Sequence, residues 1–123
     1  MPEVSSWSSI TADYAATIAK YSQDNYTSKN VTVWLRYAHE VNFYAGPNGG
    51  QQVYKAGQDY YGFIQAWANI YNAIKDVEGL YLWWCPNADT SSEPVAPWWP
   101  GADQVDIVGM DIYPQADLDR LLL

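Results

Sequence analysis

The sequence contains little cysteine, little positive charge and no long hydrophobic run. Its single cysteine, Cys85, cannot form an intramolecular disulfide or a multi-cysteine zinc site. Six Lys and Arg residues against 14 Asp and Glu residues give a net charge of −8, and so acidic a chain repels nucleic acids and anionic membranes. No apolar run approaches the roughly 18 residues of a membrane span. Nucleic acid and membrane are therefore not expected partners.

Aromatic residues with a polar group are abundant instead. The 123 residues include 7 Trp and 11 Tyr but only 2 Phe. Such side chains stack on sugars, on other flat ligands or on protein partners, and they also fill cores. A hydrophobic content of 49% excludes wholesale disorder, and the length predicts one domain over 1–123.

The signals for cellular location are weak. The first residues show neither the basic nor the apolar stretch of a signal peptide. Two tripeptides, Asn25-Tyr26-Thr27 and Asn30-Val31-Thr32, match the acceptor pattern for N-linked glycans. They favour a secreted, extracellular protein whose leader is missing from this chain.

Hydrophobic periodicity predicts alternating helices and strands. Nearly continuous apolar strands separated by a helical crossover indicate a parallel α/β sheet. In sequence order we expect a helix at 11–21, a strand at 31–37, a long loop at 38–57, a helix at 60–74, a strand at 80–84, a second long loop at 86–104, a strand at 105–110 and the start of a helix at 117–123.

Polar side chains follow each predicted strand. Ligands of parallel α/β proteins bind at the carboxyl ends of strands, where these side chains converge if the strands are parallel. They are His39, Glu40 and Asn42 after the first strand, Asn87 and Asp89 after the second, and Asp111 and Tyr113 after the third.

Several catalytic motifs are excluded. His39-Glu40 does not begin a zinc-protease motif, because residue 43 is Phe and the chain has one His. There is no Gly-x-Ser-x-Gly nucleophile turn and no phosphate-binding Gly-rich loop followed by Lys. No metal or cofactor is predicted.

Glu40 is the best candidate for acid/base chemistry. A carboxyl group in aromatic surroundings suits a general acid that protonates a glycosidic oxygen. Glycoside hydrolysis needs a second carboxylate, which Asp111 or Asp89 would supply. The alternative is a structural Glu40 bonded to Arg36 or to a backbone amide, with Asn42 and Asn87 forming turns and Asp111 anchoring a loop.

The two pairs of adjacent tryptophans are expected in different surroundings. Trp83 and Trp84 are adjacent in a strand, so they face opposite sides and at least one belongs to the core. Trp98 and Trp99 stand between prolines in a loop, where one of them is a candidate for stacking on a ligand.

The segment Trp34-Leu35-Arg36-Tyr37-Ala38-His39-Glu40-Val41-Asn42 resembles glycoside hydrolase family 26, the β-mannanases and related β-glycan hydrolases with a (β/α)8 barrel. So do Leu82-Trp83-Trp84-Cys85-Pro86-Asn87, with Cys85 where Ser is usual, and the tract 99–113 that ends in Gly-x-Asp-x-Tyr. The resemblance implies that Glu40 is the general acid/base, with His39 and Asn42 beside it.

The resemblance also implies what is missing. The family's nucleophile is a Glu on the seventh strand, and no Glu follows Glu93. A barrel needs about 250 residues, so this chain matches roughly half of one. We expect a partial barrel or an α/β sandwich with a mainly parallel sheet of three to four strands, completed by a homodimer that covers the open edges.

Three functions remain. Loss of one catalytic group costs orders of magnitude in rate, whereas stacking on aromatic rings survives it. The sequence therefore favours a binding protein for a mannan-like β-glycan, a polysaccharide or oligosaccharide. The alternatives are an active β-mannanase with Glu40 as acid/base, and an inactive fragment. Besides Glu40, the predicted binding residues are Arg36, His39, Asn42, Tyr44, Trp84, Asn87, Trp98, Trp99, Asp111 and Tyr113.

Overall fold

The computed structural model describes residues 5–47, 49 and 54–113. Its elements are the helices α1 (Ala12–Asn25), α2 (Val41–Tyr44) and α3 (Tyr60–Ile74), the strands β1 (Val33–Leu35), β2 (Leu80–Trp84) and β3 (Ile107–Val108), and the 3-10 turns Trp7–Ser9, Thr27–Lys29, Ala96–Trp98 and Ala102–Gln104. The element types match the sequence prediction, except that the predicted loop at 38–57 contains α2. The helix expected at 117–123 lies outside the described residues.

The helices α1 and α3 begin at capping side chains. Thr11 accepts a hydrogen bond from the Tyr14 amide at 3.1 Å, and Asp59 accepts one from the Gly62 amide at 2.9 Å. Each bond satisfies one of the free amides of a first helical turn. The apolar face of α3 then becomes fully buried, as the helical period of its sequence predicts; its members are Phe63, Ala66, Trp67, Ile70 and Ile74.

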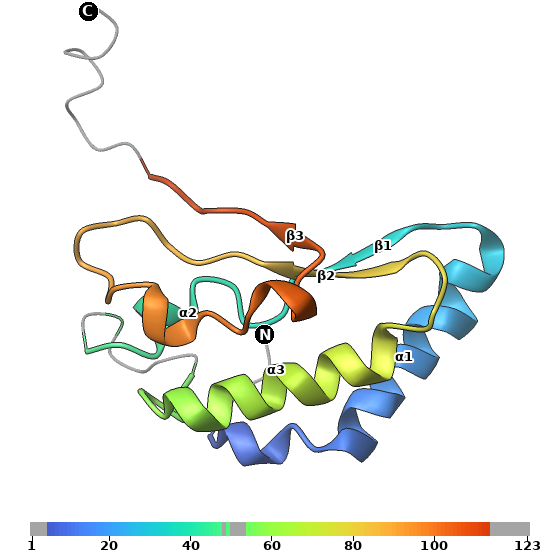
Figure 1. Ribbon diagram of the computed structural model, residues 1–123, viewed down its shortest axis with the longest axis horizontal. Coiled ribbons are helices and arrows are strands. Elements are labelled where there is room, and N and C mark those ends of the chain that lie inside the picture. Colours follow the sequence, from blue (N-terminus) through green and yellow to red (C-terminus); the bar gives the residue numbers. More distant parts are fainter. Residues whose placement is uncertain (1–4, 48, 50–53, 114–123) are drawn as a thin grey trace, which may run out of the picture.

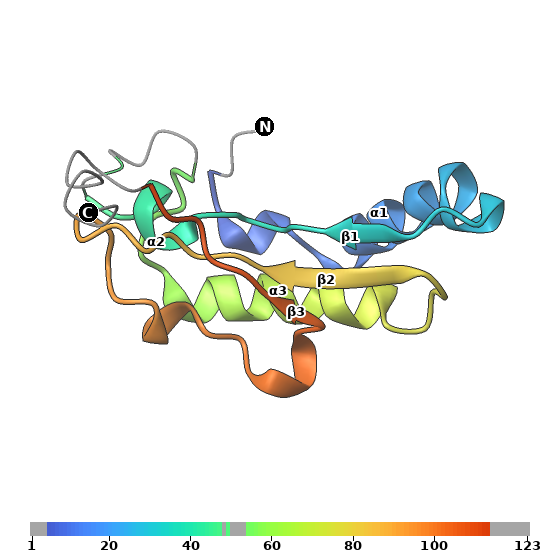
Figure 2. The ribbon, with the colours of Figure 1, turned by 90° about the horizontal axis from the view of Figure 1, so that it is seen from above.

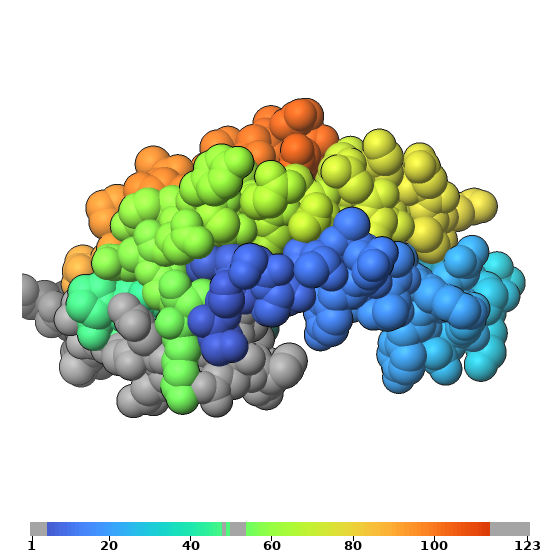
Figure 3. Space-filling model, turned by 90° about the horizontal axis from the view of Figure 1, so that it is seen from below, coloured from blue at the N-terminus to red at the C-terminus, as the bar shows by residue number. Residues whose placement is uncertain are grey.

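The three strands form a parallel sheet in the order β1-β2-β3. Helices α1 and α3 lie together on one side of it (Figures 1 and 3), and Figure 2 looks onto the other side, which no helix of the described residues covers. The prediction of a parallel α/β sheet is confirmed. The sheet is open and does not close into a barrel.

Side chains of β2 alternate between the two faces of the sheet. Leu80, Leu82 and Trp84 are buried on the helical side, while Tyr81 and Trp83 belong to the open side. On that side the ring of Tyr81 stacks on Trp34 of β1 at 4.5 Å between centroids. The open face therefore carries aromatic rings from both strands.

No helix in the described part of the chain is both long enough and apolar enough to cross a bilayer. The longest of them, α3, has 15 residues and packs its apolar face inside the protein.

Candidate functional site

The carboxyl ends of the strands bring the predicted polar residues together. Past β2, Asn87 pairs with Asp111 in an isolated parallel bridge, so the second and third strand ends run side by side. Past β1, the amide of Glu40 donates to the carbonyl of Cys85 at 2.8 Å. Figure 1 shows α2, which follows Glu40 directly, beyond these strand ends. Residues far apart in sequence thus form one cluster, as expected from parallel strands.

Glu40 is held in place through both its backbone and its side chain. Its backbone is left-handed, with φ 53° and ψ 32°, a conformation that is uncommon for residues other than glycine. The side chain is only 3% exposed. Its carboxylate accepts a hydrogen bond from Nδ2 of Asn87 at 3.0 Å and another from the Tyr113 hydroxyl. This second bond and the nearby negative charge raise the pKa of Tyr113.

The side chain of Asn42 holds the loop that positions this carboxylate. Its side chain is fully buried, with Nδ2 donating to the carbonyls of Asn87 and Glu93, both at 2.9 Å. Its Oδ1 accepts from the amide of Asn87 at 2.8 Å. The side-chain amide of Asn42 thus makes its hydrogen bonds to the backbone of the loop that follows β2. Direct contact between Asn42 and a ligand stays a prediction.

A second cluster surrounds Arg36. The guanidinium group lies 5.2 Å from the ring of Trp83 and makes an ion pair with Asp111 at 3.4 Å. The thiol of Cys85 donates to the same carboxylate at 3.4 Å. Burial, followed by the bond to Asp111, raises the pKa of this thiol. The structural alternative for Glu40 named Arg36 or a backbone amide as its partner, and of these two Arg36 pairs with Asp111 instead.

Trp83 is a site residue that the sequence pattern did not indicate. Its ring lies against Gly109, the residue directly after β3, where an added Cβ would lie 2.4 Å from Nε1 of Trp83. The signals available were the strand alternation and a glycine in an apolar strand, which often marks a close approach.

His39 and Tyr44 border the cluster together with a tyrosine that the sequence did not indicate. The rings of His39 and Tyr44 lie edge to face at 5.9 Å. The Tyr54 hydroxyl donates to the carbonyl of His39 at 3.1 Å. Burial raises the pKa of Tyr54, so it stays a neutral donor. No periodic pattern in the long loop singled it out.

Other predicted residues are not brought to this cluster. Trp84 and Trp98 are buried in the core, where Nε1 of Trp84 donates to the carbonyl of Trp98 at 3.0 Å. The alternation of β2 turns Trp84 towards the helices, and Trp98 lies on the same side of the sheet. Trp99 is 38% exposed and its ring meets Trp84 at 4.9 Å between centroids, so its stacking on a ligand stays a prediction. Asp89 accepts bonds from the amide and hydroxyl of Ser91, which lower its pKa and close a local turn.

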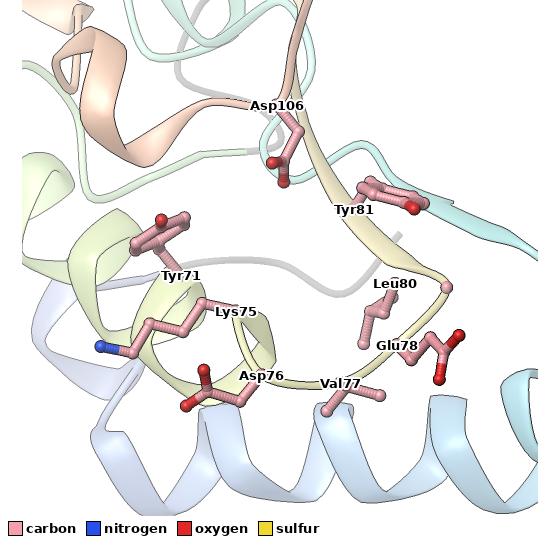
Figure 4. Close-up of a pocket in the computed structure, with 9 residues that line it drawn as sticks. Tyr71, Lys75, Asp76, Val77, Glu78, Leu80, Tyr81 and Asp106 are labelled. Carbon is pink, nitrogen blue, oxygen red and sulfur yellow. The ribbon is translucent and has the colours of Figure 1, made fainter.

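A hollow of about 290 Å³ lies at the opposite end of β2, between Tyr71, Lys75 and Asp106. Figure 4 shows its charged side chains Lys75 and Glu78 pointing away from one another. The carboxylate of Asp106 is bonded to the Leu82 amide at 2.8 Å. The polar groups of this hollow do not converge as they do around Glu40. We therefore place the candidate site at the carboxyl edge of the sheet. No group of metal-ligating side chains occurs within the ranges given above.

The cluster lies at the carboxyl ends of parallel strands, which is where (β/α)8 barrels place their active sites. The sequence model of glycosyl hydrolase family 26 matches residues 4–120, and the chain belongs to this family. A mannan endo-1,4-beta-mannosidase A and B of Caldalkalibacillus mannanilyticus is 33% identical over 94 residues. The crystal structure of the YdhT protein from Bacillus subtilis superposes with a TM-score of 0.61 at 25% identity.

Both relatives are much longer than the matched region. The alignment with the mannosidase covers 73% of this chain and 18% of that protein. The structural match covers 88% of this chain and 34% of the Bacillus subtilis chain. The family of the chain is thus established, and its activity and ligands are matters for proposal.

Proposed function

We propose that this chain binds a mannan-like β-glycan at the carboxyl edge of its sheet. The observation that carries the proposal is the carboxylate of Glu40, which Asn87 and Tyr113 hold by hydrogen bonds beside the Arg36–Asp111 pair. Carboxylates and guanidinium groups bind sugar hydroxyls, and aromatic rings stack on sugar faces. The name of the mannosidase relative supports mannan as the first ligand to test.

Hydrolysis is the second candidate, with Glu40 as the general acid/base. It needs a partner carboxylate that is free to attack the sugar or to activate water. Asp111 is occupied by Arg36 and Cys85, and Asp89 is bonded within its own turn. Since a catalytic carboxylate that is tied up in other bonds costs a large part of the rate, the pairing of both candidates favours binding.

The change Glu40→Gln tests both candidates. It replaces an acceptor oxygen by an amide at a position faced by two donors, so we expect at least about tenfold weaker binding of manno-oligosaccharides by calorimetry. The matched control is Glu78→Gln, an exposed glutamate at the other end of the sheet, which should leave the affinity unchanged.

A reducing-sugar assay on β-mannan and mixed-linkage β-glucan separates the candidates. Turnover by the wild type that disappears in Glu40→Gln would establish hydrolysis. Binding without turnover is the result that we expect. Neither binding nor turnover would overturn both candidates and leave an inactive fragment.

We also propose that a second copy covers the open edges of the sheet. Among the described residues no further strand pairs with the outer edge of β1 or of β3, and parallel sheets are normally buried on both faces. Sedimentation equilibrium is expected to give twice the mass of one chain. A single-chain mass over the whole concentration range would contradict the dimer and leave the glycan proposal intact.

A further inference from the structure

We propose that Asn30 is the acceptor of an N-linked oligosaccharide and that the neighbouring candidate Asn25 is not. Both begin a tripeptide with Thr in the third place, and they stand five positions apart. The proposal rests on a second one, that the protein is secreted, which the same tripeptides favour.

Asn30 lies in an exposed turn between α1 and β1. Its backbone is left-handed, with φ 60° and ψ 28°, and its amide donates to the carbonyl of Thr27 at 3.1 Å. Asparagine tolerates this conformation better than most residues. Within the described ranges its side-chain amide makes no hydrogen bond, and Thr32 of the same tripeptide is also exposed. The nitrogen that would carry the sugar is therefore free.

Asn25 is in a different position. It is the last residue of α1, and its Nδ2 donates to the carbonyl of Tyr21 at 2.9 Å. The backbone amide of the next residue, Tyr26, donates a hydrogen bond to the carbonyl of Ser22 and ends the helix. The acceptor nitrogen of Asn25 is thus already engaged at the helix end, where it satisfies the carbonyl of Tyr21.

The turn is also placed so that a glycan leaves the candidate site open. Asn30 precedes β1 and Glu40 follows it, so the two residues belong to opposite ends of the sheet. Figure 1 shows the turn between α1 and β1 at the far end of the molecule from α2, and Figure 2 agrees. A hollow of about 270 Å³ beside Thr27, Asn30 and Gly79 gives space to the first sugar.

The modification is a group transfer from a polyprenyl-diphosphate-linked oligosaccharide. Nδ2 of Asn30 forms a bond to the anomeric carbon of the oligosaccharide. The bond between that carbon and the diphosphate oxygen breaks, the polyprenyl diphosphate leaves, and one amide proton passes to a base of the transferring enzyme.

Secretion of the full chain from a eukaryotic host, behind a leader peptide, tests the proposal. We expect the secreted wild type to lose the mass of one glycan on treatment with peptide N-glycosidase. Asn30→Gln and Thr32→Ala should abolish this loss, whereas Asn25→Gln and Thr32→Ser should retain it. Because Thr32→Ala leaves Asn30 in place, its result does not depend on replacing the asparagine.

Three results would each overturn the proposal. They are a mass loss that persists in Asn30→Gln, a mass loss that disappears in Asn25→Gln, and a wild type that carries no glycan. Glycan binding by chain made in bacteria, which carries no such modification, is measured separately. Failure at Asn30 and failure of the proposed function are therefore distinguishable.

Discussion

Replacing Trp98 by alanine is expected to destabilise the fold by about 3–5 kcal/mol, the usual cost of deleting a buried aromatic side chain. Trp98 is completely buried, and its ring meets Tyr60 at 4.8 Å and Phe63 at 5.2 Å between centroids, both edge to face. Since domains are stable by only about 5–15 kcal/mol, urea unfolding should show a sharply lowered midpoint.

Trp99→Ala is the matched control, because it removes the same side chain one position further along. Trp99 is 38% exposed and contacts Trp84 at 4.9 Å. The free energy of unfolding of this variant should lie within about 1 kcal/mol of the wild-type value, in the range of substitutions away from the core. If Trp99 stacks on a sugar, glycan binding weakens while stability holds. Equal destabilisation by both substitutions would contradict the assignment of Trp98 alone to the core.

Asn42→Ala is the second change with a large expected effect. It removes three hydrogen bonds from a fully buried side chain and leaves the amide and carbonyl of Asn87 and the carbonyl of Glu93 without this partner. Unsatisfied buried groups cost about 1–3 kcal/mol each, so the two backbone groups of the buried Asn87 alone predict a loss of about 2–6 kcal/mol in unfolding free energy. Glycan binding should fall as well, because Asn87 would no longer be held against Glu40.

The control for Asn42 is Asn69→Ala. Asn69 is half-buried and donates a single hydrogen bond, to the carbonyl of Ile10 at 2.9 Å, so about 1 kcal/mol is expected. Urea unfolding compares the two variants, and calorimetry measures binding at a temperature where both are folded. If Asn42→Ala were no more destabilising than Asn69→Ala, the role of Asn42 in holding this loop would be refuted.

Much of the fold was predictable because its signals are local. The apolar residues of α3 recur at the helical period, and Asp59 caps the helix, so this element is specified by its own residues. The polar residues after each strand predicted a site at the carboxyl edge, and Glu40, Asn87 and Tyr113 meet there. The helix α2 was missed because its four residues are too few to show a period.

The assignment of individual aromatic side chains was less predictable. Strand alternation stated that Trp83 and Trp84 face opposite sides, but not which one faces the helices. Likewise, Trp98 and Trp99 have the same chemistry and the same proline-rich surroundings, and only packing against Phe63 buries one of them. Burial depends on residues far along the chain, and sequence patterns of a few residues carry no information about them.

The sequence by itself determined the family and the parallel α/β class, and it singled out Glu40 as the candidate carboxylate, because these depend on motifs and periodicity within short segments. The tertiary structure decided the partners of each group: Asp111 for Arg36, Asn87 and Tyr113 for Glu40, and loop backbone for Asn42. Hydrogen bonds between strand ends join residues more than 40 positions apart. Only a folded sheet sets those distances, and with them the chemistry that each side chain is free to perform.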